Sequence, residues 1–283
     1  MSRTITFKGS PLTMVGRAVK EADVAPDFRV LSGDLQEVRL SQFKEVIKII
    51  TSFPSLDTPV CDMQVKEFNK RATSLSDDVV VLGISKDLPF AQKRFCEDND
   101  IKRVMVLSDY RYSSFGINYG LLIKELNLLA RAVCILDRSN IIRYIQIVGE
   151  LTAPPDYDRV MENLRDVLAR PALPGQGAQP ARCVPCEGGI AALPRDAAER
   201  LAGRIKGWEL VEGTKLRKEF TFRDFAEAKY FLDLLAVIAE EQGHHPVLTL
   251  LYNKVRVTLT THAAGGLTEN DFIMAGIIDE IRV

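Results

Sequence analysis

The chain has 283 residues, of which 46% are hydrophobic and 27% charged, and its formal net charge is −1. This balance gives no electrostatic case for binding nucleic acid or an anionic membrane, and no run approaches the roughly 18 apolar residues of a membrane helix. The N-terminal residues lack the apolar core of a secretory signal, and the five cysteines are an odd number, which argues against a structural disulfide framework. We therefore expect a cytoplasmic protein, and the length favours two domains.

The first part of the chain alternates apolar strands with helical patterns. After the first strand, Val65, Phe68 and Leu75 recur at helical spacing, and Pro89 stands where a second helix opens. The alternation predicts an α/β domain. The predicted strands are residues 46–53, 78–85, 103–109 and 131–137.

A stretch rich in proline and glycine interrupts the chain at residues 168–190. We predict a first domain of residues 1–168, a linker of residues 169–189 and a second domain of residues 190–283. The linker contains the pattern CVPC, with Cys183 and Cys186. A lone CxxC fits a redox pair, half of a metal site, or two exposed linker cysteines that occur there by chance and have no function. We leave these alternatives open.

The second part has the order αββαββα, which predicts an α+β domain. A long helix runs from about Asp224 to Gln242 and ends at Gly243, a residue suited to close a helix. A hairpin follows over residues 246–262, and a last helix starts at Thr268.

Cys61 stands where a predicted strand runs into a predicted helix. Pro54, Thr58 and Cys61 form P-x-x-x-T-x-x-C directly ahead of the helical spacing. A cysteine in the first turn of a helix faces the positive end of the dipole and free N–H groups, which both stabilise a thiolate. The Thr58 hydroxyl can point at the sulfur, the Pro54 ring can shield it, and Arg131 can supply a positive charge. Peroxide reduction needs these parts.

This first segment resembles the thiol peroxidases, a family of peroxiredoxins, over about residues 3–168. The resemblance implies a thioredoxin fold, with Cys61 as the peroxidatic and Cys96 as the resolving thiol. It also implies reduction of hydrogen peroxide and organic hydroperoxides, thioredoxin as the reductant, and a homodimer. The residues it implies as supports of Cys61 are Pro54, Thr58 and Arg131. The matching blocks are APDF (25–28), FPSLDTPVCD (53–62), DLPFAQKRFC (87–96), the ARAV stretch (130–133) and PDYD (155–158).

Oxidation of Cys61 would give a sulfenic acid, which a second thiol converts to a disulfide. A disulfide requires two Cα atoms within roughly 7 Å, and cysteines on two intact helices rarely meet that limit. We therefore predict local unwinding around Cys61 and Cys96 during turnover. Cys134 lies inside an apolar strand, and we expect it in the core.

All three histidines, His244, His245 and His262, lie in the second segment. If Asn253–Lys254 is a two-residue hairpin turn, His245 is paired with His262. Directly opposed residues lie about 5 Å apart at Cβ, so this register brings two imidazoles together with His244 beside them. Such a cluster fits a zinc site or general acid–base catalysis.

Two carboxylates could orient or tune these imidazoles. Glu240 lies one turn before His244, and Asp271 follows the hairpin. Asp271 also fits a structural role, because Thr268-x-x-Asp271 resembles a capping box. The two roles are compatible, and we leave both open.

The second segment resembles the pterin-4a-carbinolamine dehydratases over about residues 190–283. The resemblance implies dehydration of 4a-hydroxytetrahydropterin to quinonoid dihydropterin without a metal or other cofactor, in a dimer or tetramer. Trp208 matches a tryptophan of the family, and we favour a packing role for it. The family's active-site pattern E-x-x-x-H-H-P is met by Glu240, His244, His245 and Pro246. The other matching blocks are GWELVEG (207–213), YNKVRVTLTTH (252–262) and GLTENDF (266–272).

We therefore predict a bifunctional enzyme that reduces hydroperoxides at Cys61 and dehydrates a pterin at the histidine cluster. Two alternatives stay open. In one, the second domain is a non-catalytic pterin-binding or dimerisation module. In the other, the first domain is a redox sensor that regulates the dehydratase.

Overall fold

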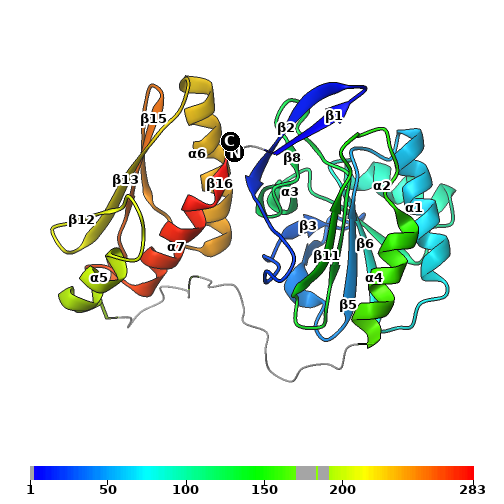
Figure 1. Cartoon of the computed structure of the whole chain (residues 1–283), viewed down its shortest axis with the longest axis horizontal. Helices are drawn as coiled ribbons and strands as arrows, with labels where there is room; N and C mark the ends of the chain where they lie inside the picture. Colours follow the sequence, from blue (N-terminus) through cyan, green and yellow to red (C-terminus); the bar gives the residue numbers. More distant parts are fainter. Residues whose placement is uncertain (1–2, 170–182, 184–190) are drawn as a thin grey trace. The chain divides into compact units, whose positions relative to one another are not determined.

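The computed structural model describes residues 3–169, Cys183 and residues 191–283. The chain forms two compact units, Met1–Pro180 and Ala181–Val283, which we describe one at a time (Figure 1). The predicted linker lies almost wholly outside the described residues, and so does Cys186. No helix within the described ranges is long and apolar enough to cross a membrane.

The centre of the first unit is a seven-stranded mixed sheet (Figure 1). Its strands, in the order in which they lie in the sheet, are β11 (Ile142–Ile147), β10 (Ala132–Leu136), β5 (Ile47–Ser52), β6 (Val79–Ser85), β7 (Val104–Ser108), β3 (Arg29–Leu31) and β4 (Glu37–Arg39). β5, β6 and β7 are parallel, and β10 pairs antiparallel with β5. Every residue of β5 is buried, as expected for a strand covered on both faces. The four predicted strands and the α/β class are confirmed.

Helices cover both faces of this sheet (Figure 1). The helices are α1 (Pro59–Ala72), α2 (Pro89–Asp98), α3 (Ser114–Asn118), α4 (Tyr157–Ala169) and the short 3-10 helix η1 (Leu40–Gln42). On one face, Val65 and Phe68 of α1 share a buried cluster with Leu164 of α4. On the other face, Phe115 of α3 packs edge-on against Phe28, with ring centres 5.5 Å apart.

A second, smaller antiparallel sheet of the first unit lies outside the predicted elements. Its strands are β1 (Arg3–Phe7), β2 (Ser10–Arg17), β8 (Leu122–Ile123) and β9 (Leu128–Leu129). The turn between the first two falls on Lys8 and Gly9, both with positive φ (51° and 81°). Two-residue turns of this kind favour glycine because their backbone crowds a Cβ atom.

The second unit has the predicted αββαββα order and one further short strand, β16, at its end. Its elements are α5 (Arg195–Ala202), β12 (Glu209–Val211), β13 (Lys215–Thr221), α6 (Phe225–Gln242), β14 (Val247–Leu251), β15 (Lys254–Leu259), the 3-10 helix η2 (His262–Ala264), α7 (Glu269–Asp279) and β16 (Ile281–Arg282). An antiparallel sheet β12-β13-β15-β14 packs against α6 and α7 (Figure 1). Asp224 caps α6 by accepting the N–H of Glu227 at 2.9 Å, and Gly243 ends it at φ 60°. The predicted bounds of this helix are confirmed.

The hairpin of β14 and β15 has another register than the predicted one. Leu248 pairs with Val257, and the turn falls on Tyr252–Asn253 instead of Asn253–Lys254. Asn253 is fixed there because its Nδ2 donates to the carbonyl of Phe222 at 2.9 Å and its own carbonyl accepts the Phe222 N–H at 2.8 Å. Because the side chains of a strand alternate with a period of two, a shift by two residues leaves each side chain on the same face of the hairpin.

The same shift makes the predicted pairing of His245 with His262 wrong. Strand β14 starts at Val247, after His245, and β15 ends at Leu259. His262 lies beyond that end, as the first residue of η2. The two histidines therefore stand outside the strand ladder that was expected to place them face to face.

Candidate active sites

Helix α1 places Cys61 in its first turn. Thr58 is the N-cap residue, with an extended backbone (φ −109°, ψ 142°), and Pro59 opens the helix, where the missing N–H leaves no hydrogen bond unmade. The Thr58 carbonyl accepts the N–H of Cys61 at 3.1 Å. Because Cys61 lies in the first turn, its sulfur is at the positive end of the helix dipole. Its side chain is also fully buried, which keeps the sulfur away from bulk water.

Two side chains donate toward the Cys61 sulfur. Thr58 Oγ1 lies 2.8 Å from Sγ, and Nη2 of Arg131 lies 3.4 Å from it. Both donors favour a thiolate, because hydrogen bonds to a charged acceptor are stronger than those to a neutral one. Arg131 is 1% exposed, so water screens its charge little. Pro54 is buried at the start of the loop between β5 and α1, and its shielding role stays a prediction.

Gln64 also belongs to this site, although it was not among the predicted residues. It is fully buried, and its Oε1 accepts a hydrogen bond from Nη1 of Arg131. Its Nε2 donates to the Thr51 hydroxyl and to the Ser52 carbonyl of β5. Gln64 therefore orients the guanidinium that faces Cys61. The sequence holds a signal for it, because a polar residue three positions after Cys61 falls in the apolar stripe of the helix.

Cys96 lies in the last turn of α2, half-buried against the cluster that contains Cys61. Burial, together with the neighbouring Glu97 carboxylate, raises the pKa of the Cys96 thiol from 9.0 to about 11. Both thiols are free, so the structure shows the reduced form. Cys134 is buried in β10, where burial raises its pKa to about 12. Its predicted place in the core is confirmed.

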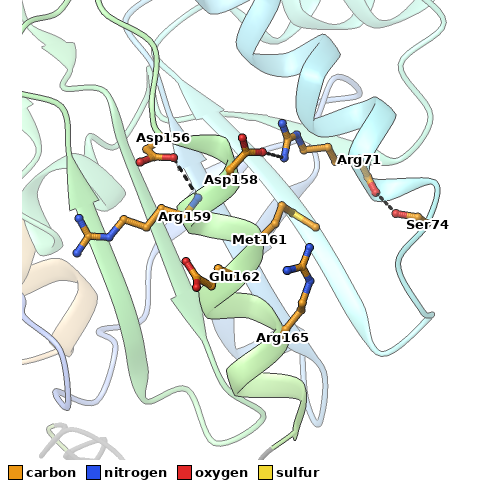
Figure 2. A pocket seen from close by; sticks show the side chains of 8 residues that line it. All are labelled: Arg71, Ser74, Asp156, Asp158, Arg159, Met161, Glu162 and Arg165. Carbon is orange, nitrogen blue, oxygen red and sulfur yellow. Dashed lines mark hydrogen bonds and ion pairs between the residues drawn. The ribbon is translucent and has the colours of Figure 1, made fainter.

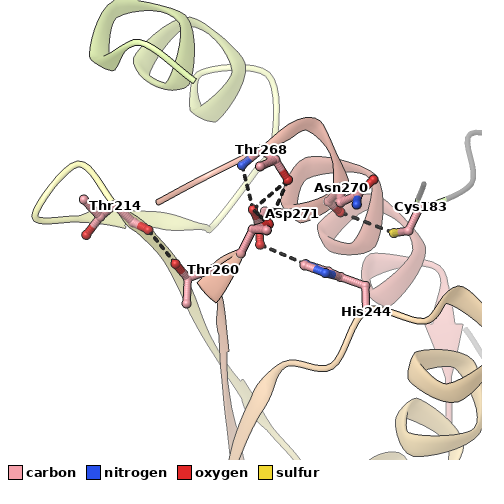
Figure 3. A network of polar contacts seen from close by, with 8 residues as sticks. Cys183, Thr214, His244, Thr260, Thr268, Asn270 and Asp271 are labelled. Atoms are coloured by element: carbon pink, nitrogen blue, oxygen red, sulfur yellow. Dashed lines mark hydrogen bonds and ion pairs between the residues drawn. The ribbon is translucent and has the colours of Figure 1, made fainter. Parts of the chain in front are cut away.

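In the second unit, His244 pairs with Asp271 in a buried polar network (Figure 3). Nε2 of His244 lies 2.9 Å from Oδ1 of Asp271. The other oxygen, Oδ2, accepts the backbone N–H of Thr268 and the hydroxyl of Thr261, both at 2.8 Å. Carboxylate oxygens accept hydrogen bonds, so we assign Nε2 of His244 as the donor in this contact.

Asp271 makes contacts that fit both of the roles that the sequence left open. With Thr268 it forms the predicted capping box at the start of α7. The same carboxylate holds His244, which follows the end of α6. The capping role is confirmed, and the role of Asp271 in orienting the imidazole for catalysis stays a prediction.

His245 and His262 lie at the surface. His245 is 61% exposed, and its Nε2 lies 3.2 Å from Oε1 of the exposed Glu240. His262 is exposed at the start of η2. Among the residues that the structure describes, no group of three His, Cys, Asp or Glu side chains is suited to hold a metal ion.

Known proteins resemble both units. The Redoxin family profile matches residues 20–161, and the profile of pterin 4 alpha carbinolamine dehydratase matches residues 191–281. A thiol peroxidase of Oceanobacillus iheyensis is 47% identical over 160 residues, which are 56% of this chain and 97% of that protein. The chain belongs to the redoxin family.

Further relatives agree with this membership. A thiol peroxidase of Staphylococcus saprophyticus is 47% identical over 163 residues, 58% of this chain and 98% of that protein. The crystal structure of a peroxiredoxin-like protein from Aquifex aeolicus superposes with a TM-score of 0.56 at 43% identity, over 58% of this chain and 97% of that one. The predicted thioredoxin fold and an enzyme with a thiol peroxidase and a pterin-4a-carbinolamine dehydratase domain are confirmed.

Trp208 of this redoxin-family chain packs inside the second unit. It is 7% exposed, its Nε1 donates to Oδ2 of Asp279 at 3.2 Å, and its ring meets Phe220 edge-on with centroids 6.3 Å apart. The indole N–H thus has a hydrogen-bond partner and the ring is packed against an aromatic side chain. Both contacts favour the predicted packing role.

Of the CVPC pattern, the structure describes Cys183 alone. Cys183 is buried, its backbone N–H donates to Oε1 of Gln242 at 3.2 Å, and its sulfur lies 3.5 Å from the carbonyl oxygen of Asn270 (Figure 3). Cys183 thus contacts the end of α6 and the start of α7, next to the His244–Asp271 pair. The redox and metal alternatives for CVPC involve Cys186, which lies outside the described residues.

A cavity of about 700 Å³ lies in the first unit between the end of α1 and α4 (Figure 2). Its charges are of both signs, and Arg71 and Asp158 pair there at 2.7 Å. None of the predicted catalytic side chains lines it, so we do not assign the peroxide reaction to this cavity. Its lining residues are Arg71, Ser74, Asp156, Asp158, Arg159, Met161, Glu162 and Arg165.

Proposed function

We propose that the first unit reduces hydrogen peroxide and organic hydroperoxides with Cys61 as the attacking thiolate. The observation that carries this proposal is the position of its sulfur, 2.8 Å from the Thr58 hydroxyl and 3.4 Å from the Arg131 guanidinium. The thiolate attacks one peroxide oxygen and the O–O bond breaks. The electron pair leaves with the other oxygen, which Arg131 stabilises and which takes up a proton to become water or an alcohol. Cys61 becomes a sulfenic acid.

Cys96 then resolves the sulfenic acid. Its sulfur attacks the sulfur of Cys61, the S–O bond breaks, and the oxygen leaves as water while the disulfide forms. Thioredoxin supplies the two electrons and two protons that restore both thiols. Pro54 keeps water from the sulfur. The thiol peroxidase relatives at 47% identity support the peroxidase assignment. We propose in addition that the enzyme is homo-oligomeric and cytoplasmic.

The second unit, in this proposal, dehydrates 4a-hydroxytetrahydropterin. The C4a–O bond breaks, the oxygen leaves as water after protonation, and a ring N–H loses a proton to give the quinonoid dihydropterin. His244, His245 and His262 donate and accept these protons. Asp271 fixes His244, and Glu240 lies beside His245. The buried 2.9 Å contact of His244 with Asp271 and the matching family profile support this function.

A paired assay tests both activities on wild type, Cys61→Ser and His245→Ala. We expect Cys61→Ser to lose peroxide reduction with thioredoxin and to retain carbinolamine dehydration, and His245→Ala to show the reverse pattern. Retention of peroxide reduction in Cys61→Ser would contradict the first assignment. Full dehydration by His245→Ala would contradict its role, and failure of the wild type to turn over pterin would favour the non-catalytic module. A dehydration rate that follows the oxidation of Cys61 would favour the redox sensor.

A further inference from the structure

Asp87 ties the loop before Cys61 to the segment before the helix of Cys96. It follows β6 and stands two residues ahead of α2. Its Oδ1 accepts the Ser55 hydroxyl at 2.6 Å, and its Oδ2 accepts the backbone N–H of Leu56 at 2.8 Å. One carboxylate therefore holds both residues at the middle of the loop that carries Cys61 into α1.

The carboxylate is anchored to the sheet on its other side. The buried hydroxyl of Ser85, in β6, donates to Oδ2 of Asp87 at 2.7 Å. Gln92 of α2, 1% exposed, donates to Ser85 Oγ at 3.0 Å and to the Leu107 carbonyl at 2.8 Å. The Ser108 hydroxyl donates to the backbone carbonyl of Asp87. The position of the loop is thus set by the core of the sheet, through Asp87.

Ser55 passes this constraint to the sulfur through Thr58. The Thr58 hydroxyl lies 3.0 Å from the Ser55 carbonyl oxygen and 2.8 Å from Sγ of Cys61. A hydroxyl has one proton, so it donates to one of these two acceptors at a time. A thiolate is the stronger acceptor, and the Ser55 oxygen competes with it. Asp87 fixes the position of the Ser55 oxygen. That position therefore determines how readily the Thr58 hydroxyl donates to the sulfur of Cys61.

We propose that Asp87 is a positioning residue of the peroxide reaction and acts on Cys61 through Ser55 and Thr58. The inference rests on the proposed peroxidase function. While the tie is intact, the loop holds the sulfur beside its donors. When the tie is lost, the loop is freer to unwind, and Cys61 reaches Cys96 sooner.

The test compares Asp87→Asn and Ser55→Ala with wild type and a matched control, Asp34→Asn. Asp34 also contacts α2, through an exposed ion pair with Lys93 at 2.6 Å. Two quantities are measured: the second-order rate constant for hydrogen peroxide per reactive Cys61, and the fraction of Cys61 that becomes sulfinic acid per turnover in excess peroxide. A merely structural defect would lower the amount of reactive thiol and leave both quantities unchanged.

We expect the rate constant to fall about tenfold in Asp87→Asn, since a bond to a charged acceptor contributes on that scale, and less in Ser55→Ala. The sulfinic fraction falls in both, because Cys96 intercepts the sulfenic acid before a second peroxide does. Wild-type values in both variants would overturn the inference and leave the peroxidase function standing. No peroxide reaction in wild type and Asp34→Asn alike would overturn the peroxidase function itself. If Asp87→Asn does not fold, the same two quantities measured on Ser55→Ala test the inference.

Discussion

The imidazole of His244 and the carboxylate of Asp271 lie 2.9 Å apart in the second unit, 27 positions apart in the chain. Both side chains are buried, and the pair joins the end of α6 to the first turn of α7. Because the same carboxylate closes a capping box, any change at Asp271 alters helix stability and the histidine together. A second helix cap without a catalytic partner separates the two effects, and Asp224 of α6 is such a cap.

We predict that Asp271→Ala lowers the free energy of unfolding by about 2 kcal/mol and the dehydration rate by about 100-fold. The matched variant Asp224→Ala loses about 1 kcal/mol and keeps the wild-type rate. Urea unfolding and initial dehydration rates measure both. Equal rates in Asp271→Ala and Asp224→Ala would show that Asp271 serves only as a cap.

Gln64→Leu should weaken the peroxide reaction without touching the sulfur. The change removes the acceptor that holds Nη1 of Arg131 and leaves a buried donor unpaired, which costs about 1–3 kcal/mol of stability. With its guanidinium no longer fixed, we expect Arg131 to stabilise the leaving oxygen less well, and the rate constant for hydrogen peroxide to fall about tenfold. Stopped-flow kinetics tests this, and an unchanged rate constant would contradict the orienting role of Gln64.

Lys48 predicts a pH dependence of stability. It is fully buried in β5, its Nζ donates to Oδ1 of Asn140 at 2.7 Å, and burial lowers its pKa from 10.5 to about 8, although nearby Asp137 opposes this. Between these values the unfolded chain binds the proton and the folded chain does not, so stability rises with pH. Below about pH 8 Lys48 is protonated in the folded chain as well, and burying its charge lowers the free energy of unfolding.

We expect the unfolding free energy of wild type, relative to Lys48→Met, to improve by about 3 kcal/mol from pH 7.5 to 10.5. Urea titrations of both proteins across this range give the difference, in which the other titrating groups cancel. A difference that is flat with pH, or that falls, would mean that Lys48 keeps its proton in the fold.

Formation of the Cys61–Cys96 disulfide should unwind the helix turns that carry these residues. In the reduced form both cysteines lie within regular helix, and burial helps to raise the pKa of Cys96 to about 11. Unwinding brings the two sulfurs together and exposes the Cys96 thiol. We expect faster amide hydrogen exchange in residues 59–63 and 94–98 of the disulfide form, with α4 as the internal reference. Equal protection in both forms would contradict the unwinding.

The features that the sequence predicts well are local ones. Thr58 and Pro59 set the start of α1 through their own backbone preferences, and Asp224 and Gly243 do the same for the ends of α6. Cys61 could therefore be placed in a first helical turn from neighbouring residues alone.

The features that it predicts poorly depend on residues distant in the chain. The register of the β14–β15 hairpin is set by Asn253 bonding to Phe222, 31 positions away, and a turn pattern alone does not contain this contact. The tie of Asp87 to Ser55 spans 32 positions between two loops. Gln64 lies between these two cases. The sequence shows a polar side chain within the apolar stripe of the helix, but it does not show that its partner is Arg131.

The central claim is that Cys61 is the thiol that peroxide oxidises first, and trapping the sulfenic acid tests it most directly. The Cys96→Ser variant, which cannot resolve Cys61, is treated with one equivalent of hydrogen peroxide in the presence of dimedone, and the modified peptides are identified by mass spectrometry. We predict that the adduct forms on Cys61. An adduct on Cys134, Cys183 or Cys186 with Cys61 unmodified would contradict the claim.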